Sequence, residues 1–220
     1  MRLATYNVQH GRTPGGDVDI DLLARSCAAL EADVLGLQEV DVNLRRSHDA
    51  DTAATVASAC GMAFVFGEAI AIRGGRYGNA LLVRGAIEDV EIIPIPDAEP
   101  RSAIVAKGTI EGGVTVSLAT THLGLRGAAA SELPLVLNAM RSRPVPRVVL
   151  GDFNLDPEDV ELLAAIAGFE RVQSEPTWPA KRPRRTIDHV LLDGLRATAA
   201  VVTPLPVSDH RALVVEVEAR

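Results

Sequence analysis

Short apolar runs recur along the whole chain, and this spacing constrains its fold more than any other feature. The runs are rich in Val, Ile, Leu, Ala and Thr, as strands are. Helical patterns are fewer: the first has Asp19 or Asp21 as a possible N-cap, and the last carries Pro157 in its first turn. Many strands with few helices predict an α/β protein in which two sheets pack face to face with the helices outside. The expected strands cover about residues 2–8, 33–39, 62–72, 78–84, 86–93, 102–111, 113–122, 146–153, 186–192, 197–204 and 211–218, and the expected helices about 19–31, 51–60, 128–140 and 157–167.

Length and composition favour a single domain spanning residues 1–220. A chain of 220 residues, 47% of them hydrophobic, can bury one sizeable core. No apolar run approaches the ~20 residues that a membrane span needs. The N-terminal MRLATYNVQHG also lacks the long apolar stretch of a secretory signal. We therefore expect a cytoplasmic protein without a transmembrane segment, and we expect a monomer. Cys27 and Cys60 form no ligand-like cluster and are expected to pack inside helices.

Polar residues stand at the ends of six of the expected strand segments. Ligands of open α/β sheets gather at the carboxyl ends of strands, so these residues are expected to converge in space. LATYN ends on Asn7, VLGLQE on Glu39, VSLATTH on His122, and VVLGDFN on Asp152 and Asn154, while TIDH carries Asp188 and VSDH carries Asp209 and His210.

The segment VVLGDFNLDP, residues 148–157, has two interpretations when it is taken alone. Side chains alternate along a strand, so Asp152 and Asn154 would face one way while Phe153 anchors in the core. Asn-Leu-Asp-Pro is also ordinary turn chemistry. The pattern of polar strand ends along the chain favours the first interpretation, in which Asp152 and Asn154 are site residues.

The oxygen-rich part of this set suits a hard cation such as Mg²⁺ or Mn²⁺. The sequence contains no HExxH, CxxC, Walker loop or GxSxG motif. Carboxylates, amides and two histidines around a hard cation fit a metal-assisted attack of water on a phosphate ester.

Seven motifs, in this order, resemble the endonuclease/exonuclease/phosphatase superfamily: TYNVQHG, LQEVD, YGNALL, TTHLG, GDFNLDP, RTIDHVLL and SDHRALV. That superfamily includes pancreatic-type deoxyribonucleases, abasic-site endonucleases, neutral sphingomyelinases, deadenylases and inositol polyphosphate phosphatases. The resemblance covers about residues 2–218. It implies a four-layer α/β sandwich with two mixed sheets inside, and Mg²⁺-dependent phosphoester hydrolysis.

The resemblance also implies a role for most of the strand-end residues. Glu39 would bind the metal, with Asn7 close beside it and Asp209 on the metal side. Asp152 would orient or deprotonate the attacking water, and Asn154 would hold a phosphate oxygen.

Two histidines complete the implied catalytic set. His210 would contact the scissile phosphate or act as the base, with Asp188 fixing its orientation, and His122 would stabilise the charged transition state. Whether Asp152 or His210 takes the proton stays open, because the usual pKa of His is near 6.5 and a metal can lower that of its water to near 7. Some relatives carry an acidic partner for the first histidine near YGNALL. Only Gly78 and Asn79 stand there, so the partner of His122 also stays open.

The net charge is −7, but nine of the 22 basic residues fall in loops near the expected site. Ordinary solvated loops are one interpretation. Taken together, these residues instead predict a positive mouth that steers an anionic substrate. Arg101 and Arg46 are expected to bind the phosphate, since the arginine fork matches phosphate oxygens, and Asn79 is expected to line the site. The nine residues are Arg45, Arg46, Arg73, Arg76, Arg126 and the four basic residues of KRPRR at 181–185.

Three functions are compatible with these observations. The first is a metal-dependent phosphodiesterase or nuclease, and the second is a phosphomonoesterase acting on a small phosphorylated metabolite or lipid headgroup. The third is a catalytically inactive domain that binds a phosphorylated partner, which the complete set of motif residues disfavours. In each case the partner is an anionic phosphoester.

Overall fold

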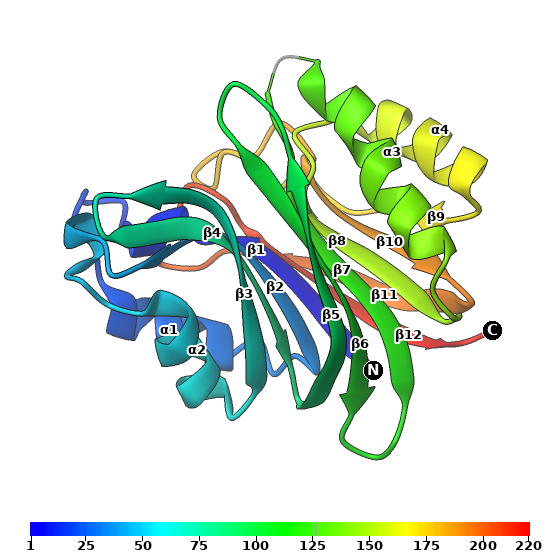
Figure 1. Ribbon diagram of the computed structural model, residues 1–220, viewed down its shortest axis with the longest axis horizontal. Helices are drawn as coiled ribbons and strands as arrows, with labels where there is room; N and C mark the ends of the chain where they lie inside the picture. Colours follow the sequence, from blue (N-terminus) through cyan, green and yellow to red (C-terminus); the bar gives the residue numbers. More distant parts are fainter. Residues whose placement is uncertain (126) are drawn as a thin grey trace.

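The computed structural model describes residues 1–125 and 127–220, and it contains two six-stranded sheets packed face to face (Figure 1). Arg126, predicted above to contribute to the positive mouth, lies outside the described residues. The first sheet has the order β11 (Leu195–Thr203), β12 (Ala212–Ala219), β1 (Arg2–Asn7), β2 (Val34–Val42), β4 (Gly75–Val83) and β3 (Ala63–Ile72). The second has the order β5 (Gly85–Ile95), β6 (Arg101–Ile110), β7 (Thr115–His122), β8 (Arg147–Asp152), β10 (Asp188–Asp193) and β9 (Glu170–Arg171).

Helices cover the outer face of each sheet. In Figure 1, α1 (Ile20–Ala28) and α2 (Thr52–Cys60) lie on one side of the sandwich, and α3 (Ala128–Arg141) and α4 (Pro157–Ala167) lie on the other. Two short 3₁₀ helices, η1 (Gln9–Gly11) and η2 (Arg45–Ser47), follow β1 and β2. The layers are therefore helix, sheet, sheet and helix, and the predicted four-layer sandwich is confirmed. In the part of the chain described here, no helix is long and apolar enough to cross a membrane.

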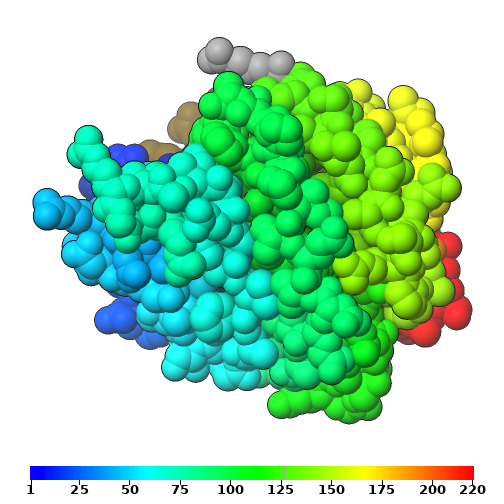
Figure 2. Space-filling model, viewed as in Figure 1, coloured from blue at the N-terminus to red at the C-terminus, as the bar shows by residue number. Residues whose placement is uncertain are grey.

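Three apolar cores hold these layers together. Leu3, Leu81, Ile104, Leu118 and Leu150 are among the residues buried between the two sheets. A second core lies under α1 and α2 and includes the free thiols of Cys27 and Cys60, which pack inside helices as expected. A third lies under α3 and α4. On the face shown in Figure 2, the cyan part of the chain and the green middle part lie side by side.

Local sequence explains where several elements begin and end. The Asp19 carboxylate accepts a hydrogen bond from the Leu22 amide at 2.8 Å, so Asp19 and not Asp21 caps α1. The strand expected from residue 113 begins at Thr115, because Gly112 and Gly113 form the preceding turn with positive φ angles. The helix expected to reach residue 31 ends at Ala28. The two-residue strand β9 was not predicted, since its sequence is too short to show an alternating pattern.

The strand directions bring distant segments to one edge of the sandwich. Both sheets are mixed, because β1 runs parallel to β2 and β7 runs parallel to β8 while the other pairs are antiparallel. The antiparallel strand β10 therefore begins beside the point where β8 ends, and β12 begins near the end of β1. The ends of β1, β2, β7 and β8 thus lie near the starts of β10 and β12. The polar residues at these strand ends therefore converge, as the sequence predicted.

Candidate active site

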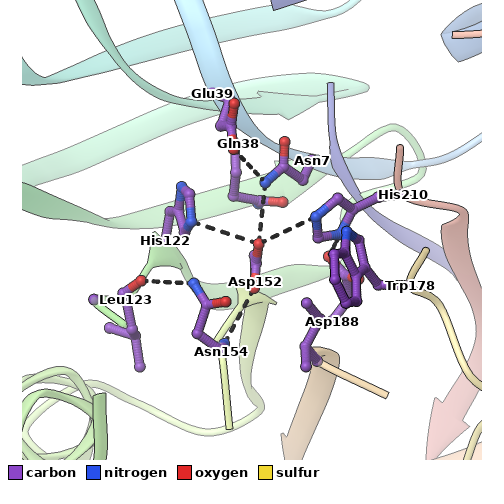
Figure 3. Close-up of polar contacts among 12 residues, drawn as sticks. Asn7, Gln38, Glu39, His122, Leu123, Asp152, Asn154, Trp178, Asp188 and His210 are labelled. Atoms are coloured by element: carbon purple, nitrogen blue, oxygen red, sulfur yellow. Dashed lines mark hydrogen bonds and ion pairs between the residues drawn. The ribbon is translucent and has the colours of Figure 1, made fainter. Parts of the chain in front are cut away.

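The Asp152 carboxylate is the centre of the polar cluster at this edge (Figure 3). Asp152 is the last residue of β8 and is almost completely buried. Its Oδ2 accepts a hydrogen bond at 3.0 Å from the amide of Asn7, the last residue of β1. The same Asn7 nitrogen donates to Glu39 Oε1 at 3.0 Å. One amide therefore joins the two sheets and holds two carboxylates next to each other.

An irregularity in β2 turns Glu39 toward the cluster. The register between β2 and β4 shifts between Leu37 and Val40, and Glu39 has a φ of +58°. Gln38 consequently points between the sheets, where its amide donates to Thr120 Oγ1 at 3.1 Å. Glu39 instead points into a cavity at the edge of the sandwich. Burial raises the pKa of Glu39, and the nearby Asp152 charge raises it further, against the opposing effect of the Asn7 hydrogen bond.

Asp188 and His210 form a buried ion pair beside Asp152. The Nδ1 atom of His210 lies 2.9 Å from Asp188 Oδ2, and Asp188 is 0% exposed. Burial by itself would lower the pKa of His210. The charge and hydrogen bond of Asp188, followed by the charges of Asp152 and Asp209, outweigh burial and raise this pKa to about 10. The ring therefore carries a positive charge at neutral pH, with Nε2 at 3.7 Å from Asp152 Oδ2.

His122 lies on the opposite side of Asp152 and has a cationic neighbour. Its Nε2 atom is 3.5 Å from Asp152 Oδ2, and its Nδ1 atom is 3.2 Å from Nη1 of Arg101. Burial lowers the pKa of His122 to about 4, with Asp152 opposing the shift and Arg101 adding to it. Among the described residues, the hydrogen-bond partner of the Nδ1 atom is thus an arginine, not the acidic group found in some relatives.

The GDFN segment contributes residues to the site and also forms a turn. The two interpretations that its sequence allowed, site residues and turn, are therefore compatible. Asp152 Oδ1 accepts a hydrogen bond from the Asn154 amide at 3.1 Å, which closes a turn, while Oδ2 faces the two histidines. Asn154 has a φ of +51°, and its side-chain amide donates to Leu123 O at 2.9 Å. Phe153 points into the core and packs on the ring of His189, with 5.5 Å between the ring centroids.

Gly151 allows the close approach of β7 and β8 just before Asp152. Its φ is +154°, and a Cβ atom at this position would lie 2.0 Å from the Thr121 carbonyl oxygen. A side chain cannot be accommodated there without moving backbone, so glycine fixes the position from which the Asp152 carboxylate projects.

Ser208 holds the loop that carries His210 onto the end of β1. Its hydroxyl donates to the Asn7 carbonyl oxygen at 2.6 Å and accepts from the His210 amide at 3.1 Å. Asp209, next in this loop, is half-buried and accepts a hydrogen bond from Trp178 Nε1 at 3.0 Å. Sequence reasoning gave no role to Ser208 or Trp178, although Ser208 belongs to the SDH motif and Trp178 is the single tryptophan of the chain.

The chemistry of these donors fits a metal ion. Asp152, Asp188 and His210 each carry a possible ligand atom, and these atoms lie within 4.8 Å of one another; His210 would bind a metal ion only after losing the ring proton described above. The expected ligands Glu39 and Asn7 lie against the same Asp152 carboxylate. Adjacent buried carboxylates are costly without a cation, and the raised pKa of Glu39 reflects that cost. Carboxylate and amide oxygens are the donors that hard divalent cations prefer.

A cavity of about 600 Å³ opens over this cluster. Glu39, Asp152, Asn154, His122 and His210 line it, whereas Asn7 and Asp188 support these residues from behind. His10, Tyr77 and Trp178 are among the other residues that line the cavity.

The three expected substrate-binding residues have different environments. Arg101 lines the cavity and is 6% exposed. Arg46 also lines it, and two hydrogen bonds of 2.7 Å join its guanidinium to Asp41. Asn79 does not line the cavity: it is 2% exposed, and its amide bridges the two sheets by donating to Ser102 O at 2.8 Å.

Of the eight basic residues of the predicted positive mouth that the structure describes, four line one of two neighbouring clefts, and Arg76, Lys181, Arg182 and Arg184 line neither. Arg185, from KRPRR, lines the main cavity and forms an ion pair with Asp156 at 3.1 Å. Arg45 and Arg73 line an adjoining cleft of about 610 Å³, and Arg46 lines both clefts. Arg76 lies over the Phe66 ring, 5.2 Å from its centroid. Arginine side chains thus border the acidic centre, and the charge of Arg185 is partly offset by Asp156.

Comparison with known proteins identifies the family to which the chain belongs. The model of the Endonuclease/Exonuclease/phosphatase family matches residues 4–210, and the chain belongs to this family. It is therefore related to hydrolases of phosphoester bonds. No curated protein matches the sequence.

Solved structures show the same fold at low sequence identity. An endonuclease/exonuclease/phosphatase from Beutenbergia cavernae is 22% identical with a TM-score of 0.81, covering 100% of this chain and 71% of that one. A mannosyl-6-phosphatase from Bacteroides thetaiotaomicron is 15% identical with a TM-score of 0.75, covering 99% of both chains. TDP2 from D. rerio, complexed with a single-strand DNA product, is 20% identical with a TM-score of 0.73, covering 100% of this chain and 99% of that one.

Proposed function

We propose that the protein is a Mg²⁺- or Mn²⁺-dependent phosphodiesterase or nuclease. The observation that carries this proposal is the buried Asp152 carboxylate, flanked by two histidines at 3.5 and 3.7 Å on the wall of a cavity bordered by arginines. A carboxylate in this setting can orient a water molecule, and histidine and arginine donors stabilise the charge that develops on a phosphate.

In this proposal Glu39 and Asn7 hold the metal, with Asp209 on the metal side. The ion would supply positive charge at the phosphate and a water of lowered pKa. Asp152 is favoured over His210 as the proton acceptor, because the raised pKa of His210 leaves its ring already protonated at neutral pH. The charged His210, oriented by Asp188, instead donates to the scissile phosphate.

The remaining polar groups position the substrate. His122 donates a hydrogen bond to the phosphate, and Asn154 holds a phosphate oxygen with the amide hydrogen that is not used on Leu123. Arg46 lines the cavity and offers the Nη1 hydrogens that are not used on Asp41, whereas Arg101 directs Nη1 at His122 and Nη2 at Glu99. The expected cytoplasmic location and monomeric state stay predictions.

A phosphomonoesterase is the second candidate. The similarity to the mannosyl-6-phosphatase structure favours it, and the similarity to TDP2 with its DNA product favours the first candidate. A catalytically inactive phosphate-binding domain is disfavoured, because seven of the expected motif residues lie within one cluster, namely Asn7, Glu39, His122, Asp152, Asn154, Asp188 and His210 (Figure 3).

A turnover screen separates these functions. The protein is assayed with Mg²⁺, Mn²⁺ or EDTA against DNA, RNA, bis-p-nitrophenyl phosphate and p-nitrophenyl phosphate. We expect diester turnover that needs the metal and is lost in EDTA, while the circular dichroism spectrum stays unchanged because the apolar cores do not depend on the ion. Turnover of the monoester alone would support the second candidate, and metal-dependent binding without turnover would support the inactive domain. Full activity in metal-free protein would contradict all metal-dependent mechanisms.

A further inference from the structure

The two histidines beside Asp152 have partners of opposite charge. His210 places Nδ1 against the Asp188 carboxylate at 2.9 Å, whereas His122 places Nδ1 against the Arg101 guanidinium at 3.2 Å. Both rings turn their Nε2 atoms toward the same carboxylate oxygen, Asp152 Oδ2. The two histidine rings thus lie on either side of Asp152, and the Nδ1 atom of one contacts a carboxylate while the Nδ1 atom of the other contacts a guanidinium.

Hydrogen-bond chemistry dictates the form of the His122 ring. A guanidinium has donors and no acceptor, so the Nδ1 atom of His122 must accept through its lone pair. A neutral imidazole with a free Nδ1 carries its proton on Nε2, and that proton faces the acceptor oxygen of Asp152. The contacts at the two ends of the ring therefore require the same tautomer.

Arg101 is itself held in place. It is 6% exposed at the start of β6, and its Nη2 atom donates to Glu99 Oε2 at 3.2 Å. Its guanidinium therefore contacts a carboxylate at one end and the His122 ring at the other, and a buried side chain held this way has few other positions available. The Nε atom of Arg101 is buried without a partner among the described residues.

We propose that Arg101 is a positioning residue that fixes His122 as the neutral Nε2–H tautomer. The site then presents the neutral donor His122 on one side of Asp152 and the Asp188-paired ring of His210 on the other. An imidazolium at His122 would stabilise the charged Asp152 carboxylate and weaken it as a proton acceptor. The functional consequence rests on the phosphoesterase activity proposed above, but the tautomer itself does not.

Nuclear magnetic resonance of the whole protein tests the tautomer without any substrate. Long-range ¹H–¹⁵N correlation on ¹⁵N-histidine-labelled protein distinguishes protonated from bare ring nitrogens. His122→Ala identifies the His122 signals by their loss from the spectrum. We expect a bare Nδ1 and a protonated Nε2 at neutral pH. A proton on Nδ1, alone or together with one on Nε2, would overturn the proposal even if the protein proves to be an active phosphoesterase.

A double-mutant cycle tests whether Arg101 acts through His122. We expect Arg101→Met to lower kcat on the order of 10- to 100-fold, by analogy with the loss of a partner that orients a metal-bound histidine. Arg101→Lys should restore part of this loss, because an ammonium group is also a pure donor. In a His122→Ala background, Arg101→Met should cost no more than about twofold further, because the two residues form one unit.

Arg171→Met is the matched control, since Arg171 is similarly buried, at 7% exposed, but lies on β9 away from the cavity. It should leave kcat unchanged if it remains folded by circular dichroism. An equal loss from Arg101→Met in both backgrounds would show that Arg101 acts directly on the substrate and would overturn the positioning role.

Discussion

Replacement of Asp188 by Asn tests the electrostatic design of the site at its most buried ion pair. Asp188 is 0% exposed, and its carboxylate holds His210 Nδ1 at 2.9 Å. Asparagine keeps the size of the side chain and an oxygen acceptor but removes the negative charge. Burial, which lowers the pKa of His210, is then opposed only by the charges of Asp152 and Asp209, so this pKa should fall well below its value in the wild-type protein.

The expected loss of stability follows from the raised pKa of His210, which Asp188 supports. The pKa of His210 rises from 6.5 to about 10 on folding, and at 1.36 kcal/mol per pKa unit this sets an upper value of roughly 5 kcal/mol. Removing one partner of a buried pair typically costs about 3–5 kcal/mol, which agrees. Because the pKa is raised, this stabilisation is fully present below pH 6.5 and is lost as the pH rises through about 10. The variant should therefore be less stable by about 3–5 kcal/mol at pH 6, and the difference should shrink toward pH 10.

Urea denaturation in EDTA at pH 6, 8 and 10 measures this difference without a contribution from bound metal. Asp193→Asn is the matched control, because Asp193 lies at the other end of β10 in a partly exposed pair with Arg147. Its effect should be about 1 kcal/mol or less and should change little with pH. A free-energy difference for Asp188→Asn that stays constant from pH 6 to pH 10 would refute the reasoning, because it would show that Asp188 does not hold a proton on His210.

Three further substitutions test the catalytic carboxylate, the basic loop and the backbone behind the site. Asp152→Asn should lower turnover on the order of 10²- to 10⁴-fold with little change in melting temperature; more than about a tenth of wild-type turnover would remove Asp152 from the mechanism. Changing the four basic residues of KRPRR at 181–185 to Gln should weaken binding of a polyanion and flatten its salt dependence, measured by titration at several salt concentrations, whereas an unchanged slope would mean an ordinary solvated loop. Gly151→Ala should destabilise the protein by roughly 1–3 kcal/mol and reduce turnover, because its Cβ would lie 2.0 Å from Thr121 O. Gly15→Ala, where φ is not positive and the nearest atom is 3.6 Å away, should change stability by less than about 0.5 kcal/mol, and equal effects of the two changes would contradict this explanation.

The sequence was sufficient to predict the fold and which strand ends converge, because both depend on alternating patterns and strand termini. Asn7, His122 and Asp152 each stand at the last residue of a strand, where an apolar run visibly stops. Phe153 pointing into the core follows from the same alternation. The roles of these residues in catalysis stay predictions until turnover is measured.

The contacts that the sequence could not predict depend on pairing between distant elements. The approach of Arg101 to His122 requires the antiparallel pairing of β6 with β7, which no local pattern near either residue reveals. The positive φ of Glu39 arises from an irregularity in β2 that an apolar run does not show. Asn79 was expected to line the site, but alternation alone cannot distinguish a side chain that enters a cavity from one that bridges two sheets.

Neither sheet contains all the residues of the site, so the geometry of the site depends on how the two sheets are positioned against each other. The first sheet supplies Asn7 and Glu39, and the loop before β12 supplies His210. The second sheet supplies His122, Asp152 and Asp188, and the contacts that join the halves are the Asn7–Asp152 hydrogen bond and the His210–Asp188 ion pair. Gly36 of β2 approaches β8 so closely that a Cβ there would lie 2.0 Å from Leu150 Cδ1, two residues before Asp152. The apolar packing between the sheets therefore sets the distances within the site as well as the stability of the fold.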